Sequence, residues 1–275
     1  MIKIILGAVS YDPKVVPIWD IAREHFTARG VGLEYALFSS YEFQVEAALN
    51  GFIDIAWNTN VAYLQTLNAS GGAAKAIAMR DTDVGFTSKL IARANAKFAQ
   101  LDDLNGKTIA FGSADSAQAK ILPFYYLEEA GVRFSPLLFD SDLGKHGDTG
   151  RSEYEALEAV RSGRADAAAV GGSTWVRMQE SGVFAEGEIV SFWTSEGYCH
   201  CNFTALPSVE NEKLQAFEET LFAMDANDAQ IKKMMTMEGL NRWIKTGEAE
   251  LEGYKSLAIA MKRYDLYKTF RLRSS

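Results

Sequence analysis

Short apolar runs alternate with amphipathic segments along the first part of the chain. Ile2–Val9, Val31–Phe38 and residues 52–57 are apolar runs typical of buried strands. The segments between them repeat apolar residues at helical spacing, and Gly30 and Gly51 follow as helix stops. This alternation predicts a β-α-β-α arrangement with a largely parallel sheet.

The same alternation returns further along the chain. Residues 107–111, 134–140 and 165–170 are expected to be strands, with helices between them, and Pro123 is expected to kink its helix or mark its first turn. The sequence after residue 206 predicts helices at 210–224, 228–237, 240–244 and 257–267. Two extended runs, 86–93 and 189–205, separate these blocks and are expected to cross between two lobes.

A short internal echo supports two lobes. Ser40, Glu46, Gly51 and Asp54 recur as Ser152, Glu158, Gly163 and Asp166, at a constant spacing of 112 residues. Each copy predicts a helix, a glycine stop, an aspartate and a buried strand. We therefore expect an α/β protein whose first lobe comprises residues 1–87 and 203–275, including the C-terminal helices, and whose inserted second lobe comprises residues 88–202.

Composition and charge narrow the classes of partner. The chain has 275 residues and a net charge of −8, which argues against nucleic acid as its main partner. No apolar run approaches the roughly 20 residues that a membrane-spanning helix needs. The sequence opens directly on a strand without an export signal, so it is expected to be cytoplasmic as given, or periplasmic if it is a mature form.

Polar residues open four of the predicted helices, at residues 39–41, 58–60, 113–118 and 171–174. Open parallel sheets bind ligands beyond the carboxyl ends of their strands, where helices begin. Backbone N–H groups and hydroxyl or amide side chains at these positions suit an anion such as a phosphonate, sulfonate or carboxylate.

At this point the chain resembles the phosphate/phosphonate-binding family of ABC-transporter solute receptors. The resemblance runs from about residue 4 to residue 267 and is carried by residues 39–42 with 48–57, by 104–112 with Ser116 and Pro123, and by 162–169. It implies a type II periplasmic-binding-protein fold with a hinge of two crossing strands. It also implies closure on a small molecule in an interlobe cleft and an ABC permease as partner. No cofactor is expected, apart from a divalent metal as an alternative.

The resemblance also implies particular site residues. Family members that bind phosphonates place three hydroxyl residues at one helix start, where this chain has Ser116, Ala117 and Gln118. Gln118 and Lys120 would suit a carboxylate or a polar heterocycle equally well, so the ligand is expected to be phosphonate-, carboxylate- or heterocycle-like. The expected ligand-binding residues are Tyr11, Ser40, Tyr41, Asn58, Thr59, Ser116, Gln118, Lys120, His146, Ser173 and His200.

One stretch suggests a different function. Cys199, His200 and Cys201 are consecutive, and His146 lies in a second glycine-rich and charged stretch. These four residues are the candidates for catalysis in a cytoplasmic enzyme built on the same scaffold, and the first three are weak candidates for a divalent metal. If the stretch is extended, both cysteines point one way and His200 the other. The plainer alternative is that the thiols are free and pack in the hinge, because residues two apart are poorly placed for a disulfide.

Overall fold

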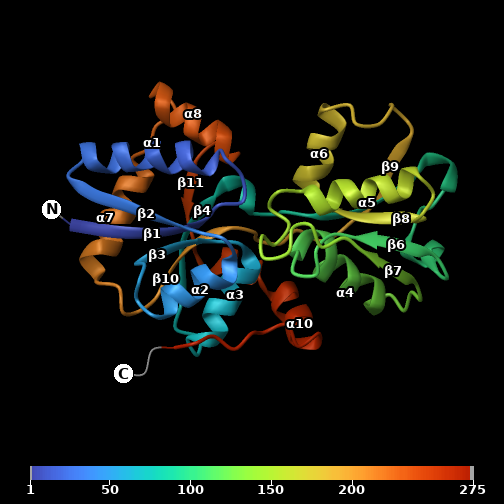
Figure 1. The fold of residues 1–275 in the computed structure, drawn as a ribbon, viewed down its shortest axis with the longest axis horizontal. Coiled ribbons are helices and arrows are strands. Elements are labelled where there is room, and N and C mark those ends of the chain that lie inside the picture. Colours follow the sequence, from blue (N-terminus) through green and yellow to red (C-terminus); the bar gives the residue numbers. More distant parts are fainter. Residues whose placement is uncertain (1, 273–275) are drawn as a thin grey trace. The chain divides into compact units, whose positions relative to one another are not determined.

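The computed structural model describes residues 2–272 (Figure 1). It divides the chain into two compact units. The first unit comprises the residues up to Val84, Cys199–Lys255 and the residues from Leu266 onward. The second comprises Gly85–Tyr198 and Ser256–Asp265.

These limits differ from the expected ones in one important respect. We expected the C-terminal helices to belong to the first lobe, but residues 256–265 belong to the second unit. The reason is a set of side-chain contacts. The Tyr264 hydroxyl donates to Glu128 Oε2 at 2.7 Å, and its ring lies edge-on to Phe124 at 5.6 Å. The chain therefore enters the second unit twice.

The first unit is built on a six-stranded sheet with the order β11-β4-β10-β3-β1-β2. Its elements are β1 (Ile2–Val9), α1 (Val15–Ala28), β2 (Val31–Phe38), α2 (Tyr41–Leu49), β3 (Ile55–Asn58), α3 (Asn60–Ala69), β4 (Lys75–Arg80), β10 (Asn202–Ala205), α7 (Asn211–Phe222), α8 (Ala229–Glu238), β11 (Trp243–Lys245) and α9 (Glu248–Glu252). Helices α1 and α8 lie on one face of the sheet, and α2 and α3 lie on the other (Figure 1).

The second unit is built on a five-stranded sheet with the order β7-β6-β8-β5-β9. Its elements are β5 (Ser88–Arg93), β6 (Thr108–Phe111), α4 (Leu122–Glu129), β7 (Ser135–Leu138), α5 (Arg151–Arg161), β8 (Ala167–Gly171), α6 (Gly172–Glu180), β9 (Ile189–Thr194) and most of α10 (Lys255–Arg263). Successive residues of its strands enter different apolar clusters, as Leu90 and Ile91 do, so both faces of the sheet are buried.

The parallel pairing that the alternation predicted is confined to one side of each sheet. It joins β1 to β2 and β3, and β6 to β7 and β8. Beside each parallel trio lies an antiparallel strand, β10 or β5, which is the first strand after the chain passes from the other unit. The α/β fold with two sheets is thus present, and each sheet is mixed.

The internal echo marks a shared structural feature. Asp54 Oδ2 accepts a hydrogen bond from the N–H of Ile5, and Asp166 Oδ2 accepts one from the N–H of Thr108. In both cases the aspartate N–H also donates to the carbonyl of that same residue. Each aspartate therefore ties the start of a buried strand to its parallel neighbour, in the same way in both units.

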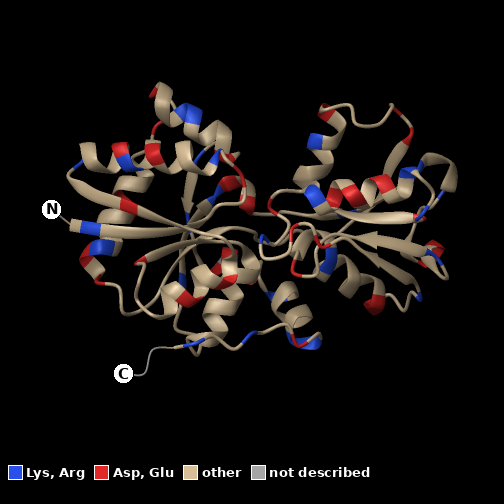
Figure 2. Cartoon of the chain, viewed as in Figure 1, with Lys and Arg blue, Asp and Glu red and all other residues tan. Residues whose placement is uncertain are grey.

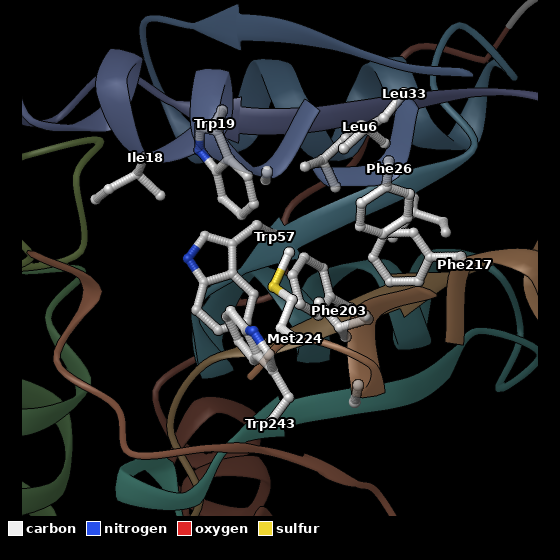
Figure 3. Close-up of a cluster of buried hydrophobic side chains, with 14 of the residues drawn as sticks. Leu6, Ile18, Trp19, Phe26, Leu33, Trp57, Phe203, Phe217, Met224 and Trp243 are labelled. Carbon is white, nitrogen blue, oxygen red and sulfur yellow. The ribbon is translucent and has the colours of Figure 1, made fainter. Parts of the chain in front are cut away.

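Aromatic side chains fill the core of the first unit (Figure 3). Phe203 on β10 lies between rings from several elements, with centroid distances of 4.6 Å to Trp57, 5.0 Å to Phe217 and 5.2 Å to Trp243. Trp19 on α1 adds an edge-on contact at 6.1 Å. These large rings bury much apolar area, so the strand that returns from the second unit is held firmly.

One local prediction is wrong, and for Pro123 the structure decides between the two expected alternatives. Residues 240–244 are not helical: α8 ends at Gly239 in the left-handed conformation, and Trp243–Lys245 then pairs with β4. Tertiary pairing therefore overrides a short helical pattern there. Pro123 does not kink a long helix but lies in the first turn of α4, directly after a π-helical turn over Ala117–Ile121.

Charges of both signs alternate along the surface helices. Figure 2 shows basic and acidic residues interspersed on α1, α5 and α8 rather than gathered into a stripe of one sign. This pattern agrees with the expectation that nucleic acid is not the partner. Within residues 2–272, no helix has the length and apolar character that crossing a membrane requires.

His25 should make the stability of the first unit depend on pH. Burial lowers the pKa of His25, and Nε2 lies 3.0 Å from the Thr220 carbonyl while Nδ1 lies 3.0 Å from Arg29 Nη1. Because the folded pKa is below the unfolded value of 6.5, this stabilisation is present above pH 6.5 and is lost as the pH falls toward the folded pKa. We expect His25→Gln to reduce the fall in urea midpoint between pH 7.5 and pH 5.5. An identical fall in both proteins would contradict this.

Candidate functional site

Three hydroxyl side chains cap helix starts in the same way. Ser40 Oγ accepts from Phe43 N at 3.4 Å, Thr59 Oγ1 from Ala62 N at 3.2 Å, and Ser116 Oγ from Ala119 N at 3.2 Å. Two of these caps are in the first unit and one is in the second. The hydroxyls of Ser40 and Ser116, which accept as caps, each have an O–H that can donate, and the first N–H groups of a helix have no partner inside it. The caps therefore combine two kinds of donor suited to an anion.

Asn58 belongs to a buried polar network in the first unit. Gln44 Nε2 donates to Asn58 Oδ1 at 2.7 Å, and Asn58 Nδ2 donates to Thr204 Oγ1 at 3.0 Å. The network continues through Asn202, whose Nδ2 donates to the Tyr254 hydroxyl at 2.9 Å. It joins α2, β3 and β10, so Asn58 fixes the strand end from which α3 begins. No motif or spacing in the sequence indicated that Gln44 and Tyr254 belong to this network.

The two expected tyrosines differ in burial. Tyr41 is buried in an apolar cluster with Val9, Val45 and Ala62, which gives it a packing role. Tyr11 is only half-buried, and Lys14 Nζ lies 5.6 Å from its ring centroid. Of the pair, Tyr11 has the more accessible ring.

Asn60 is a polar residue at the start of α3 that the expected set omitted. Its Oδ1 accepts from Val61 N at 2.9 Å, and its Nδ2 donates to the carbonyl of Cys199 at 3.1 Å. The helix start is thereby joined to the segment that enters the first unit at residue 199. The sequence had placed Asn60 at this helix start without assigning it a role.

In the second unit a glycine-rich loop lies against the capped helix start. A Cβ added to Gly147 would lie 2.5 Å from Ser116 Oγ and 2.6 Å from Gln118 Nε2, so the backbone of Gly147 approaches both side chains closely. His146 is buried, has a φ of 52°, and has its Nε2 3.9 Å from Asp115 Oδ2. The structure therefore brings Ser116, Gln118 and His146 together.

Glu153 holds the start of α6. Its Oε2 accepts from Gly171 N at 2.7 Å, and its Oε1 lies 3.4 Å from Gln118 Nε2. Burial raises the pKa of Glu153, while these hydrogen bonds act against that rise. A carboxylate of the protein itself thus occupies the N-terminus of α6, and Ser173 in its first turn is exposed. This helix start is the weakest of the four as an anion site.

Lys120 points toward aromatic rings of the second unit. Its Nζ lies 3.4 Å from the ring centroid of Phe124, 5.7 Å from that of Phe111 and 5.6 Å from that of Tyr264. Burial lowers the pKa of Lys120 to about 8, and the charge of Glu128 only partly opposes this. The ammonium is thus held by cation–π contacts.

The Cys-His-Cys stretch packs against a buried ion pair in the first unit. Asp83 binds Arg80 through two contacts of 2.7 Å, from Nε to Oδ2 and from Nη2 to Oδ1. Asp83 Oδ1 also accepts from Cys201 N at 3.1 Å, and the Asp83 carbonyl accepts from His200 N at 3.0 Å. Arg80 Nη1 extends the cluster to Glu238. These bonds hold the segments on either side of the inserted unit together.

This geometry does not favour the metal or catalytic alternatives. Cys201 Sγ at 3.0 Å and Asp83 Oδ1 at 3.6 Å both approach the same ring nitrogen, His200 Nδ1, whereas a nucleophile–histidine–acid triad uses both nitrogens. Asp83, His200 and Cys201 come within metal-ligand spacing. However, each oxygen of Asp83 already accepts two hydrogen bonds, which occupies both of its lone pairs.

The expected alternation of the three side chains is wrong. His200 and Cys201 touch, because residues 199–201 are not a regular strand. Cys199 lies elsewhere, against Gly253, and burial raises its pKa to about 11. Both cysteines are free thiols and are buried. A thiol that resists ionisation is a poor nucleophile, so Cys199 has a packing role.

Comparison with known proteins adds independent information. Residues 17–251 match the family model described as "ABC transporter, phosphonate, periplasmic substrate-binding protein". A relative from Prochlorococcus marinus (strain MIT 9301), a probable ABC transporter phosphite binding protein named PhnD1, is 25% identical over 229 residues. That alignment covers 77% of this chain and 73% of the relative.

Solved structures show the same fold. PhnD1 from Prochlorococcus marinus in complex with methylphosphonate has a TM-score of 0.74 at 19% identity, covering 96% of this chain and 98% of its own. XAC2383 from Xanthomonas citri bound to ATP has a TM-score of 0.76 at 15% identity, covering 98% of this chain and 100% of its own. At these identities the likeness concerns the fold alone.

Proposed function

Because this chain belongs to the family of ABC-transporter phosphonate periplasmic substrate-binding proteins, we propose that its ligand is a small phosphorus oxyanion of the phosphonate or phosphite class. Binding a small polar or anionic solute is the function expected from the sequence, and family membership supports it over the enzyme alternative. The same membership makes an ABC permease the partner of the protein. The name of the Prochlorococcus relative supports the choice of ligand class.

The three hydroxyl caps are the structural observation that carries this proposal. An oxyanion needs several donors. Ser40 and Ser116 each offer an O–H beside a helix N-terminus, and Thr59 caps the N-terminus of α3, where backbone N–H groups begin the helix. Helices α2 and α3 are neighbours in the first unit, and Gln44 on α2 binds the residue that precedes Thr59. We therefore assign Ser40 and Thr59 as the contacts of the first unit and Ser116 as that of the second. Gln118, His146, Tyr11 and His200 remain predicted contacts.

The compartment and the cofactor follow from the family. The family is periplasmic, which agrees with the mature-form alternative and does not support the cytoplasmic expectation. We infer that the protein acts in the periplasm. We also infer that it binds its ligand without a metal, since the hydroxyl and N–H donors are sufficient for an oxyanion. Hinge closure of the two units on the ligand remains a prediction.

Calorimetry on protein stripped of ligand by unfolding and refolding tests the function. We expect heat with methylphosphonate or phosphite, and weaker or no heat with acetate. Ser40→Ala should weaken binding about 10-fold or more, because it removes a hydrogen bond to a charged group. Ser39→Ala is the matched control, since Ser39 is an exposed neighbouring serine. Equal affinities of the two variants would exclude Ser40, and no heat with any oxyanion would exclude the ligand class.

A further inference from the structure

The C-terminal segment is attached to each unit in turn. We define the C-terminal clasp as residues 256–272, of which 256–265 belong to the second unit and those from Leu266 onward to the first. We propose that this clasp is a conformational device that limits the range of orientations between the two units. Its two attachments, described next, carry this proposal.

The first half of the clasp is bound to α4 of the second unit. Beyond the Tyr264–Glu128 bond, Arg263 pairs with Glu129 at 2.6 Å, and the guanidinium lies 5.0 Å from the ring centroid of Tyr125. The Lys120 ammonium lies 5.6 Å from the centroid of the Tyr264 ring. An aromatic ring, a charge-assisted hydrogen bond and two cation–π contacts make this a specific attachment.

The second half of the clasp is bound to α2 and α3 of the first unit. The Gln65 side chain hydrogen-bonds the backbone of this half of the clasp at two places. Its Nε2 donates to the Leu266 carbonyl at 2.8 Å, and its Oε1 accepts from Lys268 N at 2.9 Å. Lys268 Nζ reaches Glu42 Oε1 at 2.7 Å, and Asn50 Nδ2 donates to the Arg271 carbonyl at 2.8 Å. Gln65 is buried, so its two bonds are costly to lose.

Phe270 adds apolar contact to this second attachment. Its partly buried ring packs on the cluster that contains Val9, Tyr41 and Val45. Between the two attachments stands Asp265, a non-glycine residue with a φ of 51°. Tyr264, which is bound to the second unit, and Leu266, which is bound to the first, are only two residues apart, so the chain between the attachments has little slack. A short tether fixed at both ends restricts the relative motion of the bodies that it joins.

The entrance to the clasp is also fixed. Cys199 N donates to the Gly253 carbonyl at 2.9 Å, and a Cβ on Gly253 would lie 2.5 Å from Cys199 Sγ. His200 N donates to the Asp83 carbonyl at 3.0 Å. Within the first unit, the segment before the clasp therefore runs beside the segment at 199–200, which in turn is bonded to the segment at 83. The clasp adds two passages of the chain between the units, at residues 255–256 and 265–266, to the two at 84–85 and 198–199.

Distances between spin labels on the two units test the proposal without any ligand. Labels go on Glu24→Cys in α1 and Glu180→Cys in α6, since both glutamates are exposed and the native cysteines are buried. We expect Gln65→Ala, which releases the attachment to the first unit, and Tyr264→Ala, which releases the other, each to broaden the distance distribution beyond the spread of repeat measurements.

The double variant provides the sharper criterion. Tyr264→Ala already frees the clasp from the second unit, so adding Gln65→Ala should broaden the distribution no more than Tyr264→Ala alone does. Lys245→Ala, which removes an exposed ion pair with Glu218, should leave it unchanged. Circular dichroism of each variant checks folding. Unchanged widths in both single variants, or additive broadening in the double, would overturn the clasp. Because no ligand is present, this result is independent of the calorimetric one.

Discussion

Replacing Asp83 by Asn is expected to lower the free energy of unfolding by about 3–5 kcal/mol, the cost of breaking a buried ion pair. The change leaves the Arg80 guanidinium, whose side chain is 16% exposed, without its bidentate partner. It also weakens the acceptor of Cys201 N. Urea unfolding followed by circular dichroism measures the effect. A loss below about 1 kcal/mol would show that the pair contributes no more than a surface ion pair does.

The matched control is Asp20→Asn. Asp20 also pairs with an arginine three residues away, but the side chains of Arg23 and Asp20 are 41% and 39% exposed. We expect a loss of about 1 kcal/mol or less there. The charges and the sequence spacing are the same in the two pairs, whereas burial and the number of hydrogen bonds between the side chains differ.

Asp83 should also produce an acid dependence. Burial alone would raise the pKa of Asp83, but Arg80 and His200 outweigh it and lower the pKa to about 2. The folded pKa is below the unfolded value of 3.8, so the stabilisation is present above pH 3.8 and is lost as the pH falls toward about 2. The Asp83→Asn protein should therefore lose less stability than the parent protein over this interval.

Replacing Phe203 by Ala is expected to cost about 3–5 kcal/mol, because a buried aromatic ring leaves a cavity that its neighbours fill only partly. Phe203 is fully buried between Trp19, Trp57, Phe217 and Trp243 (Figure 3). Because three of these neighbours are tryptophans, the emission of the folded protein should change as well.

Phe43→Ala provides the comparison for this core change. Phe43 is 61% exposed on α2, so its removal should change the unfolding free energy by only about 0.5 kcal/mol. Urea titrations of both variants, read by tryptophan emission and by circular dichroism, give the two losses. Similar losses in the two variants would mean that the buried ring of Phe203 stabilises the fold no more than an exposed phenylalanine does.

Local patterns were sufficient for most of the fold. The apolar runs, the glycine stops and the polar helix starts depend on residues three or four positions apart, and the structure has strands and helices where these patterns indicated them. The repeated aspartate was also readable, and it marks an identical bond pattern at Ile5 and Thr108. The hydroxyl caps at Ser40, Thr59 and Ser116 follow from the same local chemistry.

The pairing of distant segments was not readable. Cys201 meets Asp83 across 118 positions, and the two residues share no local pattern. Trp243–Lys245 forms a strand because its backbone pairs antiparallel with β4. The Lys120 ammonium lies near the Tyr264 ring. Residues 256–265 belong to the second unit because their side chains find aromatic and charged partners on α4.

The Cys-His-Cys stretch illustrates the difference between what the sequence determined and what the tertiary structure decided. Its residue types alone left open a metal site, a nucleophile and, as the plainer alternative, simple packing. Two observations decide among these three alternatives: the hydrogen bonds that the oxygens of Asp83 already accept, and the surroundings in which each thiol is buried. Both depend on residues that are distant in the sequence. Sequence patterns report the preferences of adjacent residues, whereas the chemistry of a buried group is decided by the partners that folding brings to it.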